Sequence, residues 1–142
     1  WDREVIGIPY GTSSTLQSLD VFHHPNANPK NPPQPSFSDP NPQLLPVVVF
    51  VHGGAWSHGS PKLYRTLGRR LRDEGYVSVV VGYRRYPVGS SIDQSSDVGS
   101  SLEWVFNNII NYGGDPNNVA LIGHSSGAHV SALHLMSRKN KQ

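Results

Sequence analysis

Three apolar runs, separated by segments with helical patterns, constrain the fold of this chain most strongly. The first two, residues 45–51 and 76–83, are rich in valine, and the third covers residues 118–123. Strands that are buried on both faces of a parallel sheet have such unbroken apolar runs. The segments between them, residues 61–74 and 93–112, predict helices. The alternation predicts an α/β fold with a doubly wound, mostly parallel sheet.

The chain before the first valine-rich run does not show this alternation of strands and helices. Residues 4–8 and 18–22 predict two strands of an antiparallel start, whereas residues 25–46 hold most of the chain's 12 prolines, together with asparagine, serine and glutamine. Proline at this density removes backbone donors and disfavours both helix and sheet. We therefore expect residues 25–46 to form a surface insertion, with a proline-rich docking site for a partner as the alternative. Residues 1–142 are expected to belong to one domain.

A serine motif follows the third apolar run directly. Gly123-His124-Ser125-Ser126-Gly127 lies between that run and a segment with a helical pattern. This is the setting of the G-x-S-x-G nucleophile elbow, whose serine stands on a tight strand-to-helix turn. Glycine at the first and last positions would avoid the collisions that such a turn creates. We therefore predict that Ser125 is a catalytic nucleophile and that Gly123 and Gly127 support it.

A second motif, His52-Gly53-Gly54-Ala55-Trp56, follows the first apolar run. Two adjacent glycines after a central strand can leave backbone N–H groups open toward a cleft. Donors of this kind stabilise the oxyanion of a tetrahedral intermediate, and the loss of one raises the barrier by about 3–4 kcal/mol. The N–H of Ser126, at the start of a helix, would be the matching donor. The predicted oxyanion hole consists of Gly53, Gly54 and Ser126.

Taken with Gly82-Tyr83-Arg84 and residues 112–116, these motifs resemble the N-terminal portion of an α/β-hydrolase of the hormone-sensitive-lipase-like esterase group. The resemblance extends from about residue 17 to residue 129 and is greatest to the branch that contains kynurenine formamidases and related carboxylesterases. It implies that His52 orients the oxyanion loop by hydrogen bonding and that the Tyr83-Arg84 pair supports this loop. Trp56 either lines the substrate pocket or caps the loop.

The other candidate residues have plainer interpretations. His124, next to the nucleophile, is expected to be structural or to line the pocket, whereas His129 and His134 are expected to pack on the helix after Ser125. Asp93 and Asp97 are expected to stabilise the start of the long helix. No metal site or cofactor is expected, because three further histidines lack metal-ligand spacing with nearby carboxylates: His23, His24 and His58.

The resemblance also implies what this chain lacks. In this fold the triad follows the order serine, acid, histidine, and the last two lie on loops after later strands. No residue after Ser125 suits either role, and the first residue is not methionine. We therefore expect a sheet that is incomplete on its C-terminal side, as in a piece of a longer chain.

Composition limits the possible partners. The formal net charge is only +2, and the arginines of the 61–74 helix alternate with acidic residues, so no nucleic-acid partner is expected. No apolar stretch reaches the length of about 18 residues that a membrane span needs. The chain has no cysteine, which fits a cytoplasmic protein. Its oligomeric state does not follow from the sequence.

These observations favour a serine hydrolase of the carboxylesterase type, in which a small carboxylic ester transfers its acyl group to Ser125. The alternative within enzymes is an arylformamidase that hydrolyses an aryl formamide. The alternative from another class is a catalytically inactive hydrolase-like module that binds a ligand or a partner. The expected substrate is therefore a small ester or a formamide.

Overall fold

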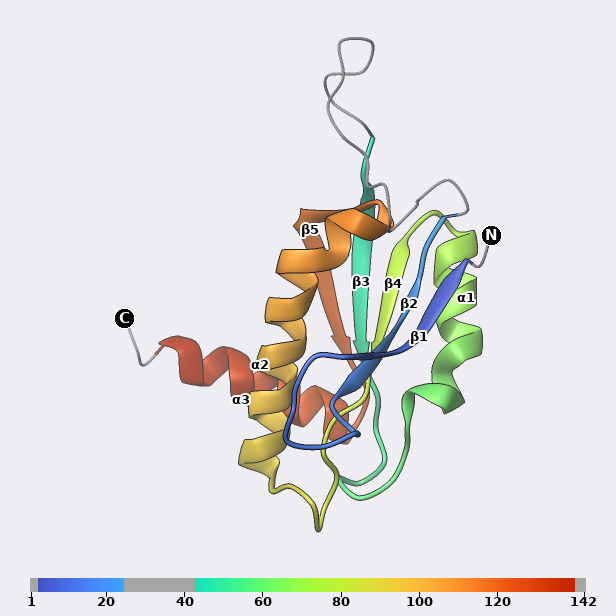
Figure 1. The fold of residues 1–142 in the computed structure, drawn as a ribbon. Helices are drawn as coiled ribbons and strands as arrows, with labels where there is room; N and C mark the ends of the chain where they lie inside the picture. Colours follow the sequence, from blue (N-terminus) through green and yellow to red (C-terminus); the bar gives the residue numbers. More distant parts are fainter. Residues whose placement is uncertain (1–2, 25–42, 140–142) are drawn as a thin grey trace.

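A five-stranded mixed sheet lies at the centre of the structure, a computed structural model that describes residues 3–24 and 43–139 (Figure 1). The strand order is β1-β2-β4-β3-β5. The strands are β1 (Glu4–Pro9), β2 (Ser18–Phe22), β3 (Leu45–Val51), β4 (Val77–Val81) and β5 (Gly114–Gly123). Residues 25–42 of the expected insertion lie outside the described residues. The last two residues of that insertion, 45 and 46, already belong to β3.

The strand directions agree with the prediction. β3 pairs in parallel with β4 on one side and β5 on the other, whereas β2 runs antiparallel to both β1 and β4. Among the described strands, β5 pairs only with β3, and Ile122 on it is 45% exposed. The sheet is therefore open along β5.

Helices cover both faces of the sheet (Figure 1). On one face, the 3-10 turn η1 (Pro61–Tyr64) and α1 (Arg65–Asp73) pack against Phe22, Phe50 and Val80. On the other face lie α2 (Ser91–Asn108), the 3-10 turn η2 (Ile109–Tyr112) and α3 (Ser126–Lys139). The alternate residues of β2, β3 and β4 point toward this second layer, where they contact buried side chains of α2 and α3. This arrangement confirms the doubly wound α/β class.

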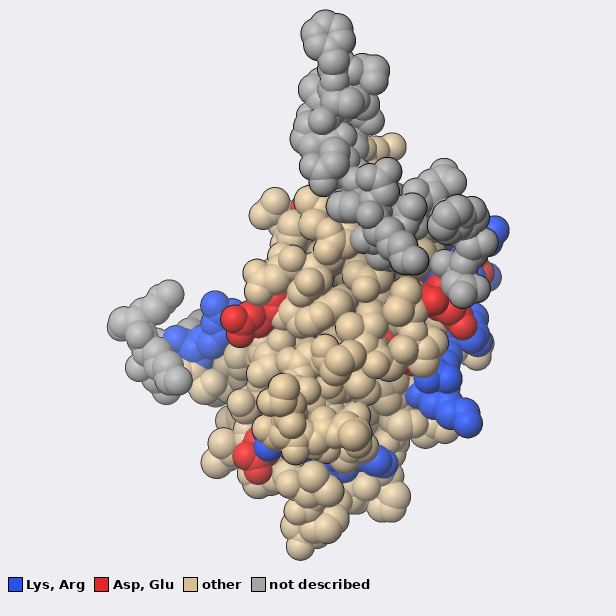
Figure 2. All heavy atoms as spheres, in the orientation of Figure 1, with Lys and Arg blue, Asp and Glu red and all other residues tan. Residues whose placement is uncertain are grey.

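Helix α1 differs in detail from the amphipathic helix that leucines at residues 63, 67 and 71 would form. Leu63 is 71% exposed, because residues 61–64 form a 3-10 turn whose three-residue period shifts this side chain away from the sheet. The backbone of α1 instead lies against the sheet at Gly68, where an added Cβ would lie 2.5 Å from the Phe22 ring. The arginines of α1 form ion pairs with neighbouring carboxylates, and Figure 2 shows the two signs of charge side by side there.

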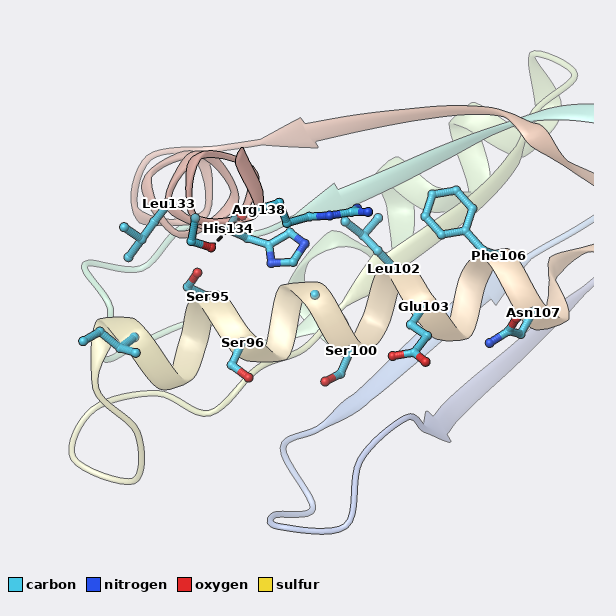
Figure 3. A pocket seen from close by; sticks show the side chains of 13 residues that line it. Ser95, Ser96, Ser100, Leu102, Glu103, Phe106, Asn107, Leu133, His134 and Arg138 are labelled. Carbon is cyan, nitrogen blue, oxygen red and sulfur yellow. Dashed lines mark hydrogen bonds between the residues drawn. The ribbon is translucent and has the colours of Figure 1, made fainter. Parts of the chain in front are cut away.

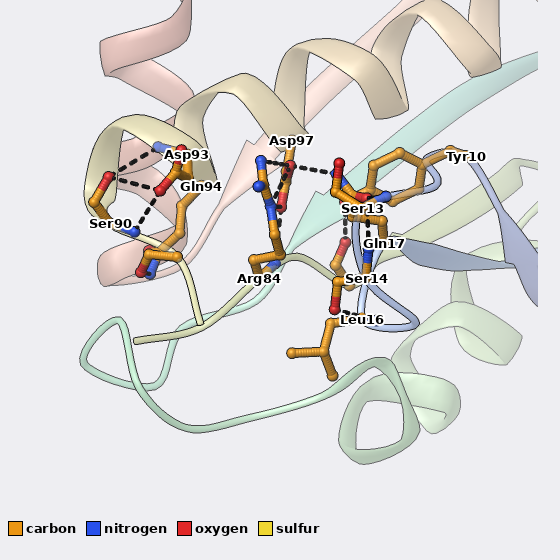
Figure 4. A network of polar contacts seen from close by, with 12 residues as sticks. Tyr10, Ser13, Ser14, Leu16, Gln17, Arg84, Ser90, Asp93, Gln94 and Asp97 are labelled. Carbon is orange, nitrogen blue, oxygen red and sulfur yellow. Dashed lines mark hydrogen bonds and ion pairs between the residues drawn. The ribbon is translucent and has the colours of Figure 1, made fainter. Parts of the chain in front are cut away.

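Of the two aspartates expected to stabilise the start of the long helix, only Asp93 does so. Asp93 completes a capping box with Ser90 at the start of α2. Asp97 is buried and accepts hydrogen bonds from Gln17 and from the backbone and guanidinium of Arg84 (Figure 4). Its carboxylate therefore joins the loop before β2 and the segment after β4 to α2, so a helix-start role for Asp97 is wrong.

No helix in the described ranges is long and apolar enough to cross a membrane.

Candidate active site

Ser125 stands on a sharp turn between β5, which ends at Gly123, and α3, which begins at Ser126. Its φ angle is 53°, in the left-handed region that non-glycine residues seldom adopt, and the residue is exposed. The His124 N–H donates to Val51 O over 3.1 Å, and Ser125 O accepts the N–H groups of Ala128 and His129. These bonds hold the turn between the sheet and the first turn of the helix.

Glycine is sterically required on both sides of this turn. A Cβ at Gly123 would lie 2.5 Å from the Ala128 Cα, and one at Gly127 would lie 2.2 Å from Val51 O. Both obstacles are backbone atoms, so neither can move aside cheaply. The supporting role predicted for Gly123 and Gly127 thus has a direct steric cause.

The loop after β3 is a second strained turn. Gly54, Ala55 and Trp56 all have positive φ angles, of 140°, 51° and 62°. Gly54 O accepts the N–H groups of Ser57 and His58, which closes the turn. Among the described residues, the backbone hydrogen bonds that close the two turns do not use the N–H groups of Gly53, Gly54 and Ser126. These are the three N–H groups that the sequence predicts as oxyanion donors.

The two turns meet at Gly53. A Cβ at this position would lie 2.8 Å from His124 O and 3.0 Å from the Ser125 Cβ. The backbone of the first motif thus packs directly against the serine of the second, with no room for a side chain between them. His124 belongs to the same contact, because its Nδ1 would lie 2.8 Å from that Cβ.

His52 and Tyr83 fix the orientation of this backbone. The His52 ring is buried and stacks on Tyr83, and its Nδ1 lies 2.7 Å from Gly53 O. The Tyr83 hydroxyl donates to His52 O over 2.7 Å. Because C=O and N–H point in opposite directions across a trans peptide, these two bonds set the directions of the Gly54 and Gly53 N–H groups. Burial lowers the pKa of His52, so the ring stays neutral and is held as part of the loop.

Trp56 and His129 form a contact that the sequence prediction missed. The Trp56 Nε1–H donates to His129 Nδ1 over 3.2 Å, and the two rings meet edge to face. His129 therefore contacts the loop after β3 as well as its own helix. No local pattern in the sequence indicates this contact, because the two residues are 73 positions apart.

Three of the histidine rings near the two turns hydrogen-bond to groups other than Ser125. His52 bonds to Gly53, His58 to Ser57 and His129 to Trp56. None of these bonds reaches the Ser125 hydroxyl, so a general base is not found among these rings. Among the described residues, no group of three or more metal-ligating side chains is placed to hold a metal ion.

Two hollows in the surface lie away from Ser125. The larger, of about 880 Å³, lies between α2 and α3 and includes Leu102, Phe106 and His134 (Figure 3). There His134 packs against Gly99, in agreement with its predicted packing role. The smaller, of about 210 Å³, lies behind His52.

Comparison with known proteins decides the family. Residues 37–142 match the family model described as BD-FAE. The chain belongs to this BD-FAE family. It is 41% identical over 99 residues to a probable isoprenylcysteine alpha-carbonyl methylesterase of Oryza sativa subsp. japonica, covering 70% of this chain and 23% of that protein. It is 31% identical over 132 residues to the esterase LipQ of Mycobacterium tuberculosis, covering 92% of this chain and 28% of that protein.

A solved structure gives the same result for the fold. Esterase B of Lactobacillus rhamnosis superposes with a TM-score of 0.74 at 27% identity, covering 92% of this chain and 38% of that one. The expected resemblance to α/β-hydrolase esterases is thereby confirmed, and the similar proteins are carboxylic ester hydrolases. The BD-FAE chain spans about a quarter of the length of its curated relatives.

The hydrogen bond from the Tyr83 hydroxyl to His52 O allows a test, in the full-length BD-FAE protein, of whether this bond orients the backbone of the loop after β3. Tyr83→Phe keeps the stacked ring and removes the bond to His52 O. A neutral hydrogen bond contributes about 0.5–1.5 kcal/mol, so we expect a fall in kcat of about 2–12-fold. Steady-state hydrolysis of p-nitrophenyl butyrate measures it.

Tyr10→Phe is the matched control, because the Tyr10 hydroxyl also donates to a backbone carbonyl, that of Gly82. It should lower thermal stability to a similar extent without the loss in kcat. Equal kcat losses in the two variants would contradict a specific role of Tyr83.

Proposed function

We propose that this chain carries the nucleophile and the oxyanion hole of a serine carboxylesterase that acts on small carboxylic esters. The observation that carries the proposal is the contact of Gly53 with Ser125, which brings the open N–H groups of one turn beside the strained serine of the other. The esterase names of its relatives support the same reaction class.

The proposed reaction is acyl transfer. The Ser125 hydroxyl loses its proton to a general base as its oxygen attacks the ester carbonyl. The carbonyl oxygen becomes an oxyanion that accepts hydrogen bonds from Gly53, Gly54 and Ser126 N–H groups. The alkoxide then leaves with a proton, and water hydrolyses the acyl-serine to release the acid and restore Ser125.

A general base has to come from outside the described residues. The rings of His52, His58 and His129 bond elsewhere, and among the described residues no histidine ring hydrogen-bonds to the Ser125 hydroxyl. Removing triad members from a serine hydrolase lowers the rate by about 10⁴–10⁶. Without such a base, the chain would instead be the inactive hydrolase-like module.

Covalent labelling tests the nucleophile in the full-length protein. A fluorophosphonate should form one adduct on Ser125, because attack at phosphorus produces the same oxyanion geometry. Peptide mapping by mass spectrometry identifies the labelled residue, and Ser125→Ala should abolish the label.

Ser131→Ala is the matched control. It removes a buried hydroxyl of α3 that has no hydrogen-bond partner among the described residues and takes no part in the proposed site, so labelling should persist. A folded full-length protein that takes the label on another residue would remove Ser125 from the mechanism. A folded full-length protein that takes no label would favour the inactive module.

The arylformamidase remains the second candidate, because the exposed Trp56 indole beside the oxyanion loop could pack against an aromatic ring. We expect p-nitrophenyl butyrate to be hydrolysed with a higher kcat/KM than N-formylkynurenine, in line with the esterase names of the relatives. A formamide preference above about tenfold, or 1.4 kcal/mol of barrier, would reverse this assignment.

A further inference from the structure

Asp97, in the second turn of α2, is a buried carboxylate that the proposed reaction does not use. Its side chain is 1% exposed, and both of its oxygens accept hydrogen bonds (Figure 4). Oδ2 accepts the backbone N–H of Arg84 over 2.9 Å, and Oδ1 accepts the Arg84 Nη2 group and the Gln17 amide, each over 2.8 Å. A carboxylate this far from water is stable only where such donors surround it, so its place in the fold is closely fixed.

The bond to the Arg84 backbone matters most, because this N–H belongs to the peptide that follows Tyr83. Gly82 comes directly after β4, and its N–H still donates to Ser18 O over 2.8 Å, in continuation of the pairing with β2. After Gly82 the chain leaves the sheet, and Asp97 then holds the peptide between Tyr83 and Arg84. The backbone of Tyr83 is therefore fixed by the sheet on one side and by the carboxylate on the other.

Tyr83 carries this fixed position to the loop after β3. Its ring stacks on His52 with 4.6 Å between the centroids, and its hydroxyl donates to His52 O over 2.7 Å. The Gly53 N–H lies on the opposite side of the same peptide from His52 O. The direction of this proposed oxyanion donor thus depends on where the Tyr83 hydroxyl lies, and that place depends on the backbone that Asp97 holds.

We infer that Asp97 is a positioning residue for the oxyanion hole: it holds the peptide after Tyr83, and through the Tyr83 hydroxyl it fixes the Gly53 N–H. The inference rests on the proposed esterase function and extends its machinery to α2. The Arg84 guanidinium has a supporting part, because its fork binds both carboxylate oxygens and keeps Oδ2 on the backbone N–H. Asp97 itself exchanges no proton with the substrate.

Asp20 is a matched control for the burial and the charge of Asp97. Its side chain is 3% exposed, and it too accepts a backbone N–H, that of Gly7 over 2.9 Å, and an arginine, Arg65 Nε over 2.8 Å. The backbone that it holds belongs to β1 rather than to the segment that carries Tyr83. A loss of stability is therefore expected for both aspartates, whereas an effect on the loop after β3 is expected for Asp97 alone.

A double-mutant cycle between Asp97→Asn and Tyr83→Phe in the full-length protein tests the inference. Asparagine keeps the shape of the side chain but places an N–H among the donors of Arg84 and Gln17. We expect kcat for p-nitrophenyl butyrate to fall by about 2–12-fold at unchanged KM, because an oxyanion donor acts on the transition state. In the Tyr83→Phe background the same substitution should change kcat by less than about 1.5-fold, since the hydroxyl through which it acts is already gone.

Two further variants control for stability and for a failure to fold. Asp20→Asn should lower the unfolding temperature to a similar extent and leave kcat within about 1.5-fold of wild type. Where Asp97→Asn does not fold, Arg84→Lys takes its place, because lysine keeps the charge but lacks the fork that binds both carboxylate oxygens. It should lower kcat by at least about twofold, but not in the Tyr83→Phe background, and Arg65→Lys is its control.

Hydrogen–deuterium exchange reads the same effect without a substrate. The N–H groups of Ser57 and His58 bond to Gly54 O, so their exchange reports how firmly the loop after β3 is held. Peptides that cover these residues should exchange about 2–12-fold faster in Asp97→Asn and in Tyr83→Phe than in wild type, and at the wild-type rate in the control aspartate variant.

The outcomes separate this inference from the function on which it rests. In an active protein that labels on Ser125, three results would each overturn the positioning role alone: additive kcat losses in the cycle, an unchanged kcat in the folded variant, or loop exchange that equals the control. A folded wild-type protein with no ester hydrolysis and no Ser125 label would overturn the proposed function, and the positioning role with it.

Discussion

The parallel register between β3 and β5, which pairs Val51 with Gly123, is the constraint on which the rest of the candidate site depends. Because both strands end at the same level, the turns that follow them start side by side. The His124 N–H then bonds to Val51 O, and Gly127 packs on the same carbonyl. A shift of one residue would separate Gly53 from Ser125 and reverse the faces of β5.

Both turns store conformational strain on a rigid support. Ala55, Trp56 and Ser125 are the non-glycine residues with positive φ in the described chain, and all three lie at the candidate site. Such backbone conformations cost about 1–3 kcal/mol each and persist only where the surroundings over-determine them. Here the surroundings are the valine-rich strands, buried on both faces, and the His52–Tyr83 stack beneath the loop. The strained geometry therefore stands on the most buried part of the fold.

The parts that the sequence predicted are those that local patterns encode. Apolar runs and glycine positions identified β3, β4 and β5 and the steric need for Gly123 and Gly127. The parts that it missed depend on pairs distant in the chain. Trp56 and His129 are 73 residues apart, and Asp97 meets Gln17 across 80 residues, so no local pattern indicates either contact. The leucine spacing at residues 63, 67 and 71 favours one buried helix face, and it does not reveal that η1 is a 3-10 turn in which Leu63 is exposed.

The central claim is that the turns after β3 and β5 together form one oxyanion site at Ser125. A crystal structure of the full-length protein with a phosphonate on its nucleophile tests this most directly. The account predicts that the adduct is on Ser125 Oγ and that the phosphonyl oxygen lies about 2.7–3.2 Å from the nitrogens of Gly53, Gly54 and Ser126. A phosphonyl oxygen bound by other donors, with the Gly53 and Gly54 N–H groups turned away from it, would contradict the account.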